Sequence, residues 1–235
     1  MTIRGAVDVL DQQQHGREAT WVVIAAMNEE GVIGGVVSEV KRAGWSVVVV
    51  DDGSRDQTAV EARAAGATVL CHLINRGQGA ALQTGIDYAV RRGAVHLVTF
   101  DADGQMNADD IPALVAALDD ADIALGSRFL GKIEGATAKR MALLKGAVLM
   151  SNRLSGLKLT DAHCGFRAFR ASVAPRLRMQ QDRMAHASEL LRKIKTSGVQ
   201  VVEVPVTIRY TAHSMAKGQN GFQAVRILFD YFFRA

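Results

Sequence analysis

Two acidic clusters each follow directly after an apolar run of the chain. Asp51 and Asp52 come after four consecutive valines, and Asp101 and Asp103 come after a second run that ends in Val-Thr-Phe. In an extended segment, the spacing of Asp101 and Asp103 would place both carboxylates on one side. Carboxylate oxygens suit Mg²⁺ or Mn²⁺, and such a cation would neutralise charge that develops on a diphosphate leaving group. One cluster alone is more typical of a turn, but two clusters, with Gln105 as a third oxygen, favour a nucleotide–metal site.

A glycine-containing loop, residues 75–82, follows a predicted strand and opens a predicted helix. Leu82 occupies the third glycine position of the dinucleotide-binding fingerprint, and the Walker phosphate-binding pattern is absent. The loop therefore predicts a glycine turn with close helix–strand packing, in which Arg76 is the candidate for a diphosphate contact.

Strand and helix signals alternate through the first half of the chain, and these elements must position the clusters. β-Branched apolar runs predict strands, and the segments between them carry helical patterns. Such alternation predicts a Rossmann-like α/β fold with a mixed, mostly parallel sheet, in which ligands bind beyond the carboxyl ends of the strands. The predicted strands are 21–26, 46–51, 68–72, 95–100 and 122–125, and the predicted helices are 30–42, 56–65, 78–91 and 109–118.

The regular alternation of strand and helix signals ends after Gly126. The second half contains a basic, helix-prone segment, a short apolar stretch, a further helix and strand, and an aromatic helix at the end. These elements are predicted at about 132–155, 164–170, 184–197, 199–206 and 219–233.

The composition indicates a folded chain. Its 235 residues are 49% hydrophobic and 22% charged, which excludes a disordered chain. The two cysteines, Cys71 and Cys164, are far apart, which disfavours a disulfide scaffold or a zinc ribbon. No apolar run has the length of a spanning helix, and the basic stretch lacks the interleaved aromatic residues of a nucleic-acid surface. We expect a polar leader over 1–19, one domain over 20–218 and a C-terminal amphipathic aromatic helix over 219–235.

Seven short motifs follow one another from about Trp21 to Gln219. They are Ala25–Glu30, Val50–Ser54, Asn75–Gly85, Asp101–Gln105, Gly126–Phe129, Thr160–Arg167 and Glu203–Val206. Each motif is modest alone, but in this order and spacing they resemble the family 2 glycosyltransferases with the single-domain GT-A fold. The resemblance is to the dolichyl-phosphate mannosyltransferase-like, or polyprenyl-phosphate glycosyltransferase, branch.

The resemblance implies roles for the matching positions. It implies that a metal ion, Mg²⁺ or Mn²⁺, is held by Asp101, Asp103 and Gln105. It implies that the reacting centre contains the catalytic residues Asp103, Arg128, Asp161 and Arg167. The nucleotide sugar would be bound by Ala25, Met27, Asn28, Glu29, Asp51, Asp52, Arg76, Gly77, Asp101, Ala102 and Lys217.

The chain departs from the family pattern at three places, one of which is Cys164, where Asn or Ser is commoner. The family usually has Pro-Ala-Tyr where this chain has Ala25-Ala26-Met27, so the loss of the aromatic ring leaves the choice between GDP- and UDP-hexose open. The motif after Arg209 matches the mannosyltransferases only loosely, so the late basic residue is either Arg209 or Lys217.

The absence of a general-base motif indicates which kind of acceptor the chain uses. Inverting transfer onto a sugar hydroxyl needs a general base within hydrogen-bond reach. The superfamily usually supplies an Asp from a Glu-Asp pair that opens a late helix, but residues 184–189 contain no such pair. A phosphate acceptor is already anionic and needs cations instead of a base, which favours a lipid phosphate. Glu189 is either a base or a structural support.

Charge is unevenly distributed. The segment from Lys132 to Arg170 has eight basic and two acidic residues, so its net charge is +6. Because the whole chain carries +4, the rest of the chain carries −2. A basic amphipathic helix suits an anionic membrane surface, although its apolar stripe could equally pack on the domain. We expect peripheral contact at the cytoplasmic, inner face of a membrane, with a homo-oligomer or a membrane partner protein left open. The stripe is Met141, Leu144, Ala147 and Val148, and its charges come from Lys139, Arg140, Lys145 and Arg153.

These observations predict a metal-dependent, inverting transferase that moves a hexosyl group from a nucleotide-diphosphate sugar to polyprenyl phosphate. One alternative is transfer to a sugar or small-molecule hydroxyl. Another is a non-catalytic nucleotide-sugar-binding protein. A nucleotidyltransferase is disfavoured because Ala25–Glu30 replace its glycine-rich loop.

Overall fold

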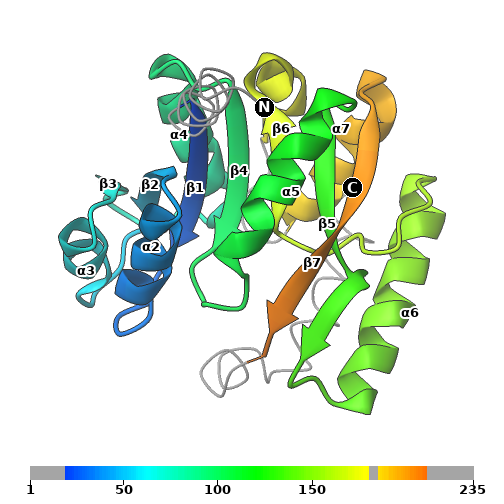
Figure 1. The fold of residues 1–235 in the computed structure, drawn as a ribbon, viewed down its shortest axis with the longest axis horizontal. Coiled ribbons are helices and arrows are strands. Elements are labelled where there is room, and N and C mark those ends of the chain that lie inside the picture. Colours follow the sequence, from blue (N-terminus) through cyan, green and yellow to red (C-terminus); the bar gives the residue numbers. More distant parts are fainter. Residues whose placement is uncertain (1–18, 180–184, 211–235) are drawn as a thin grey trace, which may run out of the picture.

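The computed structural model describes residues 19–179 and 185–210, without the side chains of 185–188. The described residues form a seven-stranded sheet of order β3-β2-β1-β4-β6-β5-β7 (Figure 1). Its strands are β1 (Thr20–Ala26), β2 (Ser46–Asp51), β3 (Thr68–Cys71), β4 (His96–Asp101), β5 (Ile123–Glu134), β6 (Arg167–Arg170) and β7 (Val201–Arg209).

Strand direction brings the two acidic clusters to one edge of the sheet. Strands β1 to β4 are parallel, β5 is parallel to β7, and β6 is antiparallel to both β4 and β5. Strand β1 lies between β2 and β4, and its last residues pair with Asp51 on one side and Asp101 on the other. The clusters therefore flank the end of β1, as the sequence predicts for a mostly parallel sheet.

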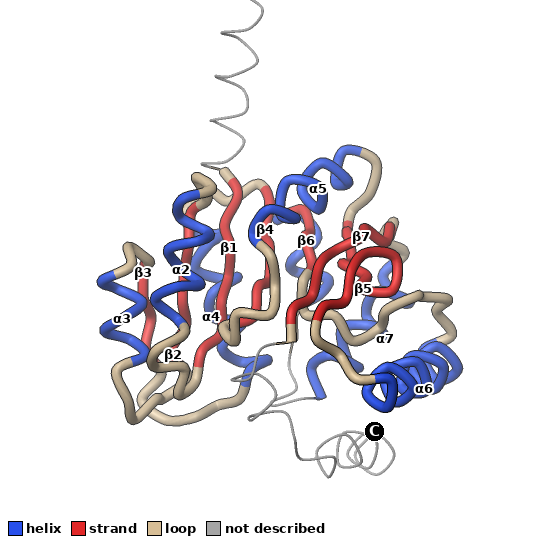
Figure 2. Tube along the Cα trace, turned by 60° about the horizontal axis from the view of Figure 1, so that its bottom comes forward, coloured by secondary structure: helices blue, strands red, loops and turns tan. Residues whose placement is uncertain are grey.

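Helices cover both faces of the sheet (Figures 1 and 2). Alternate residues of β1 enter opposite cores: Val22 and Ile24 face the layer of α2 and α5, while Val23 faces the layer of α4 and α7. This burial on both faces explains the near-continuous valine runs. The helices are α2 (Ile33–Arg42), α3 (Thr58–Ala64), α4 (Gln78–Arg91), α5 (Ile111–Ala116), α6 (Ala138–Ser155) and α7 (Ala185–Ser197), with short 3₁₀ segments at Ala108–Asp110, Ala117–Asp119 and Ala171–Leu177.

The segment after Gly126 corrects one prediction. Residues 132–134, expected to begin a helix, continue β5 and pair with 207–209 of β7 after an irregularity in the register. Helix α6 begins at Ala138, where the Thr137 side chain accepts a hydrogen bond from the backbone N–H of Arg140 at 3.3 Å. Pairing with a distant strand therefore outweighs the local helical propensity of residues 132–134. The predicted leader and the predicted helix at 219–233 lie outside the described residues, apart from Ala19.

The apolar stripe of helix α6 packs on the domain, which is one of the two positions left open for it. Val148 is buried, and Leu144 packs against the main core. At the next turn the Asn152 side chain bonds both the N–H and the C=O of Leu159, at 3.1 and 2.7 Å. A different set of apolar side chains on α6 is exposed to solvent: Leu143, Leu149, Met150 and Leu154.

Among the described residues, no helix has the length and apolar character required to cross a membrane.

Candidate active site

The loop after β1 is fastened to the turn after β2. The backbone N–H of Asn28 donates to Ser54 Oγ at 2.9 Å, and Asn28 Oδ1 accepts from the N–H of Arg55 at 3.0 Å. The N–H of Glu29 donates to Thr58 Oγ1 at 2.8 Å. Asn28 has a φ of 54°, a left-handed conformation that asparagine tolerates better than most residues. These contacts make the two loops one wall of the site.

A cleft of about 350 Å³ opens at this edge of the sheet. Asn28, Asp51 and Arg76 lie near the cleft but do not line it, and Lys217 lies outside the described residues. Gln78, which is not among the predicted site residues, also lines the cleft. It is the first residue of α4 and follows Gly77 directly, and this place in the glycine loop is the feature of the sequence that indicates it. The predicted nucleotide-sugar residues in the cleft wall are Ala25, Met27, Glu29, Asp52, Gly77, Asp101 and Ala102, joined by Asp103.

Asp101 lies where several charged groups converge. Burial and, next, the like charge of Asp103 raise the pKa of Asp101 to about 7, while Arg167 and Arg128 act in the opposite direction. The Gln78 amide donates to Asp101 Oδ1 at 3.3 Å. On the other side Gly165 approaches so closely that a Cβ there would lie 2.8 Å from Asp101 Oδ2. The glycine is therefore required by the neighbouring carboxylate.

The predicted metal ligands fit an oxygen-ligated cation. Asp103 lies in the turn after β4 and not in an extended segment, so the predicted reason for its position was wrong. It nevertheless lies close enough to Asp101 to raise that residue's pKa, and two mutually repelling carboxylates are what a divalent cation relieves. Asp103 Oδ1 also accepts from the N–H of Gln105 at 3.1 Å, which fixes the turn. The described residues contain no cluster of three or more His, Cys, Asp or Glu suited to a metal, so the amide of Gln105 would have to complete the set.

Arg128 is held in place by a buried carboxylate. Its Nε donates to Asp161 Oδ2 at 2.6 Å, and its backbone N–H reaches the same oxygen at 3.2 Å. Its Nη1 donates to the hydroxyl of Tyr210 at 2.9 Å, and the Arg140 guanidinium lies 4.3 Å from the Tyr210 ring centroid. Burial would lower the pKa of Arg128, but Asp161 offsets this and holds the pKa above its ordinary value. The sequence predicted Arg128 and Asp161 together and missed Tyr210 and Arg140.

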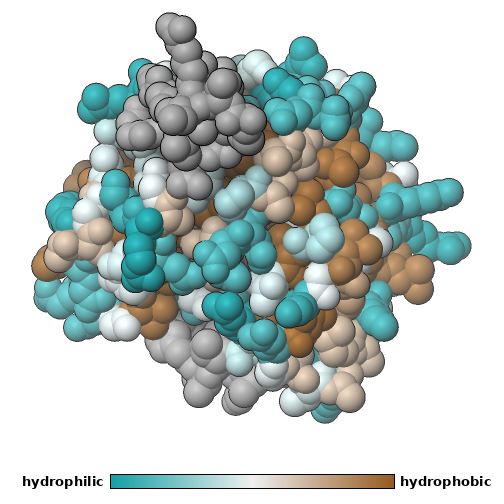
Figure 3. Space-filling view, in the orientation of Figure 1, coloured by the Kyte–Doolittle hydropathy of each residue, from teal (hydrophilic) through white to brown (hydrophobic). Residues whose placement is uncertain are grey.

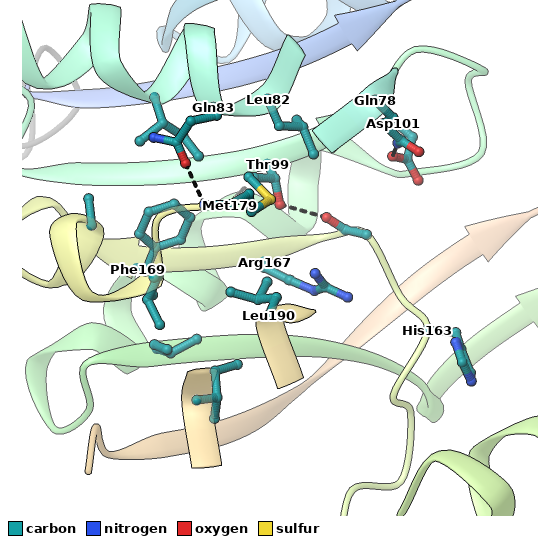
Figure 4. A pocket seen from close by; sticks show the side chains of 16 residues that line it. Gln78, Leu82, Gln83, Thr99, Asp101, His163, Arg167, Phe169, Met179 and Leu190 are labelled. Carbon is teal, nitrogen blue, oxygen red and sulfur yellow. Dashed lines mark hydrogen bonds between the residues drawn. The ribbon is translucent and has the colours of Figure 1, made fainter. Parts of the chain in front are cut away.

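Arg167 lines a second cavity, of about 140 Å³, that meets the first at Asp101 and Gln78. Its Nε donates to the carbonyl of Cys164 at 2.9 Å, and burial lowers the pKa of its guanidinium. Figure 4 shows this guanidinium extending toward the end of the cavity that Asp101 and His163 line. The rest of the wall is mostly apolar, from α4, β6 and α7.

Two further candidates have partners elsewhere. Glu189 is buried and forms an ion pair with Lys193 at 2.8 Å, one turn along α7. Arg209, one of the two late basic residues, forms an exposed ion pair with Glu134 at 3.3 Å. Neither side chain lines either cavity.

The fold, with an acidic cleft at the carboxyl ends of its parallel strands, is that of the GT-A class of glycosyltransferases. The model of the family "Glycosyl transferase family 2" matches residues 21–178, and the chain belongs to that family. It is therefore a glycosyltransferase, as the motifs predicted, and the alternative of a non-catalytic binding protein is not supported.

Curated relatives support the polyprenyl-phosphate branch. An uncharacterized protein of Methanocaldococcus jannaschii is 36% identical over 91% of this chain and 90% of its own length. The UDP-N-acetylglucosamine–dolichyl-phosphate N-acetylglucosaminyltransferase of Methanococcus voltae is 32% identical over 91% and 93%. The polyprenol monophosphomannose synthase of Mycolicibacterium smegmatis is 33% identical over 81% and 77%.

Solved structures confirm the predicted fold. The glucosyl-3-phosphoglycerate synthase of Mycobacterium tuberculosis in complex with Mg²⁺ and uridine diphosphate superposes with a TM-score of 0.69. The match covers 95% of this chain and 82% of that one at 19% identity, so it bears on the fold alone.

Proposed function

We propose that this glycosyltransferase moves a hexosyl group from GDP- or UDP-hexose to polyprenyl phosphate, with inversion and with a divalent metal ion. The observation that carries the proposal is the pair of buried arginines, Arg128 and Arg167, beside the acidic edge of the sheet. Relatives whose names include dolichyl phosphate and polyprenol phosphate support the acceptor.

The donor would occupy the cleft between the β1 loop and the start of α4. Met27 and Glu29 would face the nucleoside, and Asp101 and Asp103 would hold Mg²⁺ or Mn²⁺ against the diphosphate. Gln105 does not line the cleft, but its backbone N–H bonds Asp103, and its side chain would complete the ligand set. Bound there, the metal would supply positive charge for the departing diphosphate. Gln78, through its bond to Asp101, would fix the orientation of that carboxylate before the donor arrives.

The acceptor phosphate would bind on the arginine side of Asp101. Its oxygen is already anionic, so it would attack the anomeric carbon in line without losing a proton. Arg128 and Arg167 would offset the charge of the two phosphate groups as they approach. Glu189 supports this choice over a hydroxyl acceptor, because it is buried and paired with Lys193 and does not line either cavity.

We also propose a peripheral position at the cytoplasmic, inner face of a membrane, and the outer side of helix α6 supports contact with an anionic surface. Its outer side combines exposed Leu143 and Leu149 with the exposed cations Lys139, Lys145 and Arg153. Figure 3 shows apolar and polar side chains intermixed on the side of the molecule where α6 lies. The apolar side chains would enter the headgroup region while the cations meet lipid phosphates. A second copy or a membrane protein would be an alternative cover for the same face.

The proposal is tested with purified protein and a panel of GDP- and UDP-sugars, with and without a short-chain polyprenyl phosphate and Mn²⁺. We expect one donor to react, only with the lipid phosphate and the metal present. Asp103→Ala should abolish transfer without changing the fold. Asp109 is an exposed acidic residue nearby, and Asp109→Ala should leave transfer unchanged. Transfer at the wild-type rate by Asp103→Ala would disprove the metal assignment.

Glu189→Gln separates the two acceptor classes. A general base contributes about 10²- to 10⁴-fold, so a hydroxyl acceptor would lose at least that much. With a phosphate acceptor we expect a loss of less than about tenfold, because the glutamine keeps the shape of the side chain.

A further inference from the structure

His72 links the first acidic cluster to the helix that borders the cleft. It follows the last residue of β3, and its Nδ1 lies 2.7 Å from Asp52 Oδ1. Its Nε2 lies 3.0 Å from Thr84 Oγ1, and Thr84 Oγ1 lies 2.9 Å from the carbonyl of Ala80 in the first turn of α4. A carboxylate only accepts hydrogen bonds, so Nδ1 carries a proton. The imidazole therefore ties β2 to the start of α4.

Asp52 accepts three hydrogen bonds from within the protein. Besides His72, it accepts from the backbone N–H of Arg76 at 2.9 Å and from that of Gly77 at 2.7 Å. The Asp52 side chain is 4% exposed and that of His72 is 8% exposed. Hydrogen bonds to a buried carboxylate are among the stronger ones, so the loop is held firmly at the point where α4 begins.

The turn after β2 is shaped to receive this loop. Gly53 has a φ of +79°, and a Cβ there would lie 2.9 Å from the backbone N of Asn75 and 2.9 Å from the carbonyl carbon of Ile74. Loop and turn are thus in direct backbone contact. Gly77, at the end of the same loop, has a φ of 90° and lines the cleft.

The loop connects the two acidic clusters. Gln78, the residue after Gly77, donates from its side chain to Asp101 Oδ1 in the second cluster. A continuous series of contacts therefore runs from His72 through Asp52 and Gly77 to Gln78 and Asp101. Loss of the His72 contact would free the loop and, with it, the amide that orients Asp101.

We propose that His72 is a positioning residue for the donor diphosphate, and that Asp52 acts by fixing the loop 73–78 instead of by contacting the nucleotide. This inference rests on the proposed function, since it assumes that the cleft binds a metal–nucleotide diphosphate. It replaces the direct nucleotide contact that the motif implied for Asp52.

The experiment uses two substitutions that each retain half of the imidazole's contacts. His72→Asn keeps a donor near the position of Nδ1 and loses Thr84, while His72→Gln places its amide near the position of Nε2 and loses Asp52. His96→Asn, a partly buried histidine at the opposite end of the sheet, is the matched control. Binding of Mn²⁺–UDP and Mn²⁺–GDP is measured by calorimetry, and the exchange of backbone hydrogens in 73–82 is measured by mass spectrometry.

We expect His72→Gln to weaken binding of the nucleotide that the wild type prefers by about tenfold and to speed exchange in 73–82. His72→Asn should do both to a smaller extent, and His96→Asn should do neither. Thr84→Val removes one hydroxyl without changing the size of the side chain, and it provides a milder test if the His72 variants do not fold. We expect it to weaken nucleotide binding by about threefold.

Two results would overturn the inference. In the first, binding and loop exchange are unchanged in His72→Gln and Thr84→Val. In the second, only the melting temperature falls, which would make His72 purely structural. Failure of the proposed function looks different: the wild type would bind neither Mn²⁺–UDP nor Mn²⁺–GDP, and the positioning role would then be wrong as well, whatever the loop exchange shows.

Discussion

Glu203 on β7 fixes the backbone of Asp161, because its Oε1 accepts a hydrogen bond from the N–H of Asp161 at 3.0 Å. The same carboxylate accepts from the N–H of Thr160 at 2.8 Å and from the Thr160 hydroxyl at 2.8 Å. Asp161 in turn holds the guanidinium of Arg128 at 2.6 Å. Glu203 therefore helps to fix the position of Arg128, which it does not touch.

Replacing Glu203 should damage catalysis more than donor binding. Glu203→Ala leaves the N–H groups of Thr160 and Asp161 without their acceptor, so the loop should shift and carry Arg128 with it. We expect kcat to fall at least tenfold, while the Kd for the nucleotide diphosphate changes less than twofold. Steady-state kinetics and calorimetry check both values, with exposed Asp120→Asn as the control. Equal losses in kcat and donor affinity would show that Glu203 supports the whole site and not the arginine side.

Gly165→Ala tests the close approach of the loop to Asp101. The added Cβ would lie 2.8 Å from Asp101 Oδ2, so the carboxylate or the loop must move. We expect weaker Mn²⁺ binding and at least a tenfold loss of transfer, measured by calorimetry and by product formation. The control is Gly146→Ala in α6, where nothing lies within 4 Å of the added atom.

The two glycine variants should differ in stability as well. Gly146→Ala should raise the free energy of unfolding by about 0.5–1 kcal/mol, because alanine loses less entropy in a helix. Gly165→Ala should lower it. If Gly165→Ala retains full activity and metal affinity, the loop does not constrain Asp101.

Local patterns were sufficient to predict the first half of the sheet. Strands such as β2 are buried on both faces, so their composition carries the signal, and parallel strands bring their acidic ends to one edge whatever the details. The glycine loop also opened a helix as predicted, at Gln78.

Contacts between distant residues account for what the sequence did not predict. Residues 132–134 become strand because residues 207–209 of β7, 75 positions further along the chain, pair with them. The pairing of Asp52 with His72, 20 residues away, gives no local signal in the sequence. Tyr210 meets Arg128 across 82 residues. Such pairings depend on the tertiary structure and cannot be predicted from local composition.

His163 should make stability depend on pH. Burial lowers the pKa of its imidazole below the ordinary value of about 6.5, and its Nε2 contacts Ser151 Oγ at 2.9 Å on α6. A histidine with a lowered folded pKa binds fewer protons in the folded state than in the unfolded state. Its contribution is therefore intact above about pH 6.5 and is lost as the pH falls through the folded pKa.

His163→Asn should reduce this dependence. Asp101, whose pKa is raised to about 7, acts in the opposite direction in both proteins, so the prediction concerns their difference. Between pH 7.5 and pH 5.5 we expect the free energy of unfolding of the wild type to fall relative to that of the variant. Denaturant titrations at the two pH values measure the difference. His96 has a pKa lowered by burial in the same direction, so the double variant should differ most from the wild type in the slope of unfolding free energy against pH. An unchanged slope in both variants would contradict the account.

The outer side of α6 provides a test of membrane contact that leaves the site intact. Arg140 is excluded from the test, since it stacks on Tyr210 beside Arg128. The exposed cations Lys139, Lys145 and Arg153 should each contribute about 1 kcal/mol of attraction to an anionic surface, and this attraction should weaken with salt. Exposed Leu149 should contribute through burial of its apolar surface.

We expect the triple change of Lys139, Lys145 and Arg153 to Ser to weaken binding to vesicles rich in phosphatidylglycerol at least tenfold, without weakening Mn²⁺–nucleotide binding. Leu149→Ser should weaken vesicle binding at all salt concentrations, because the apolar contribution is not screened. Val60→Ser, an exposed apolar residue on α3, is the control. Vesicle sedimentation at two salt concentrations measures each variant. If the α6 variants and the control bind alike, α6 does not face the membrane, and its exposed leucines must be covered by a second copy or by a partner protein.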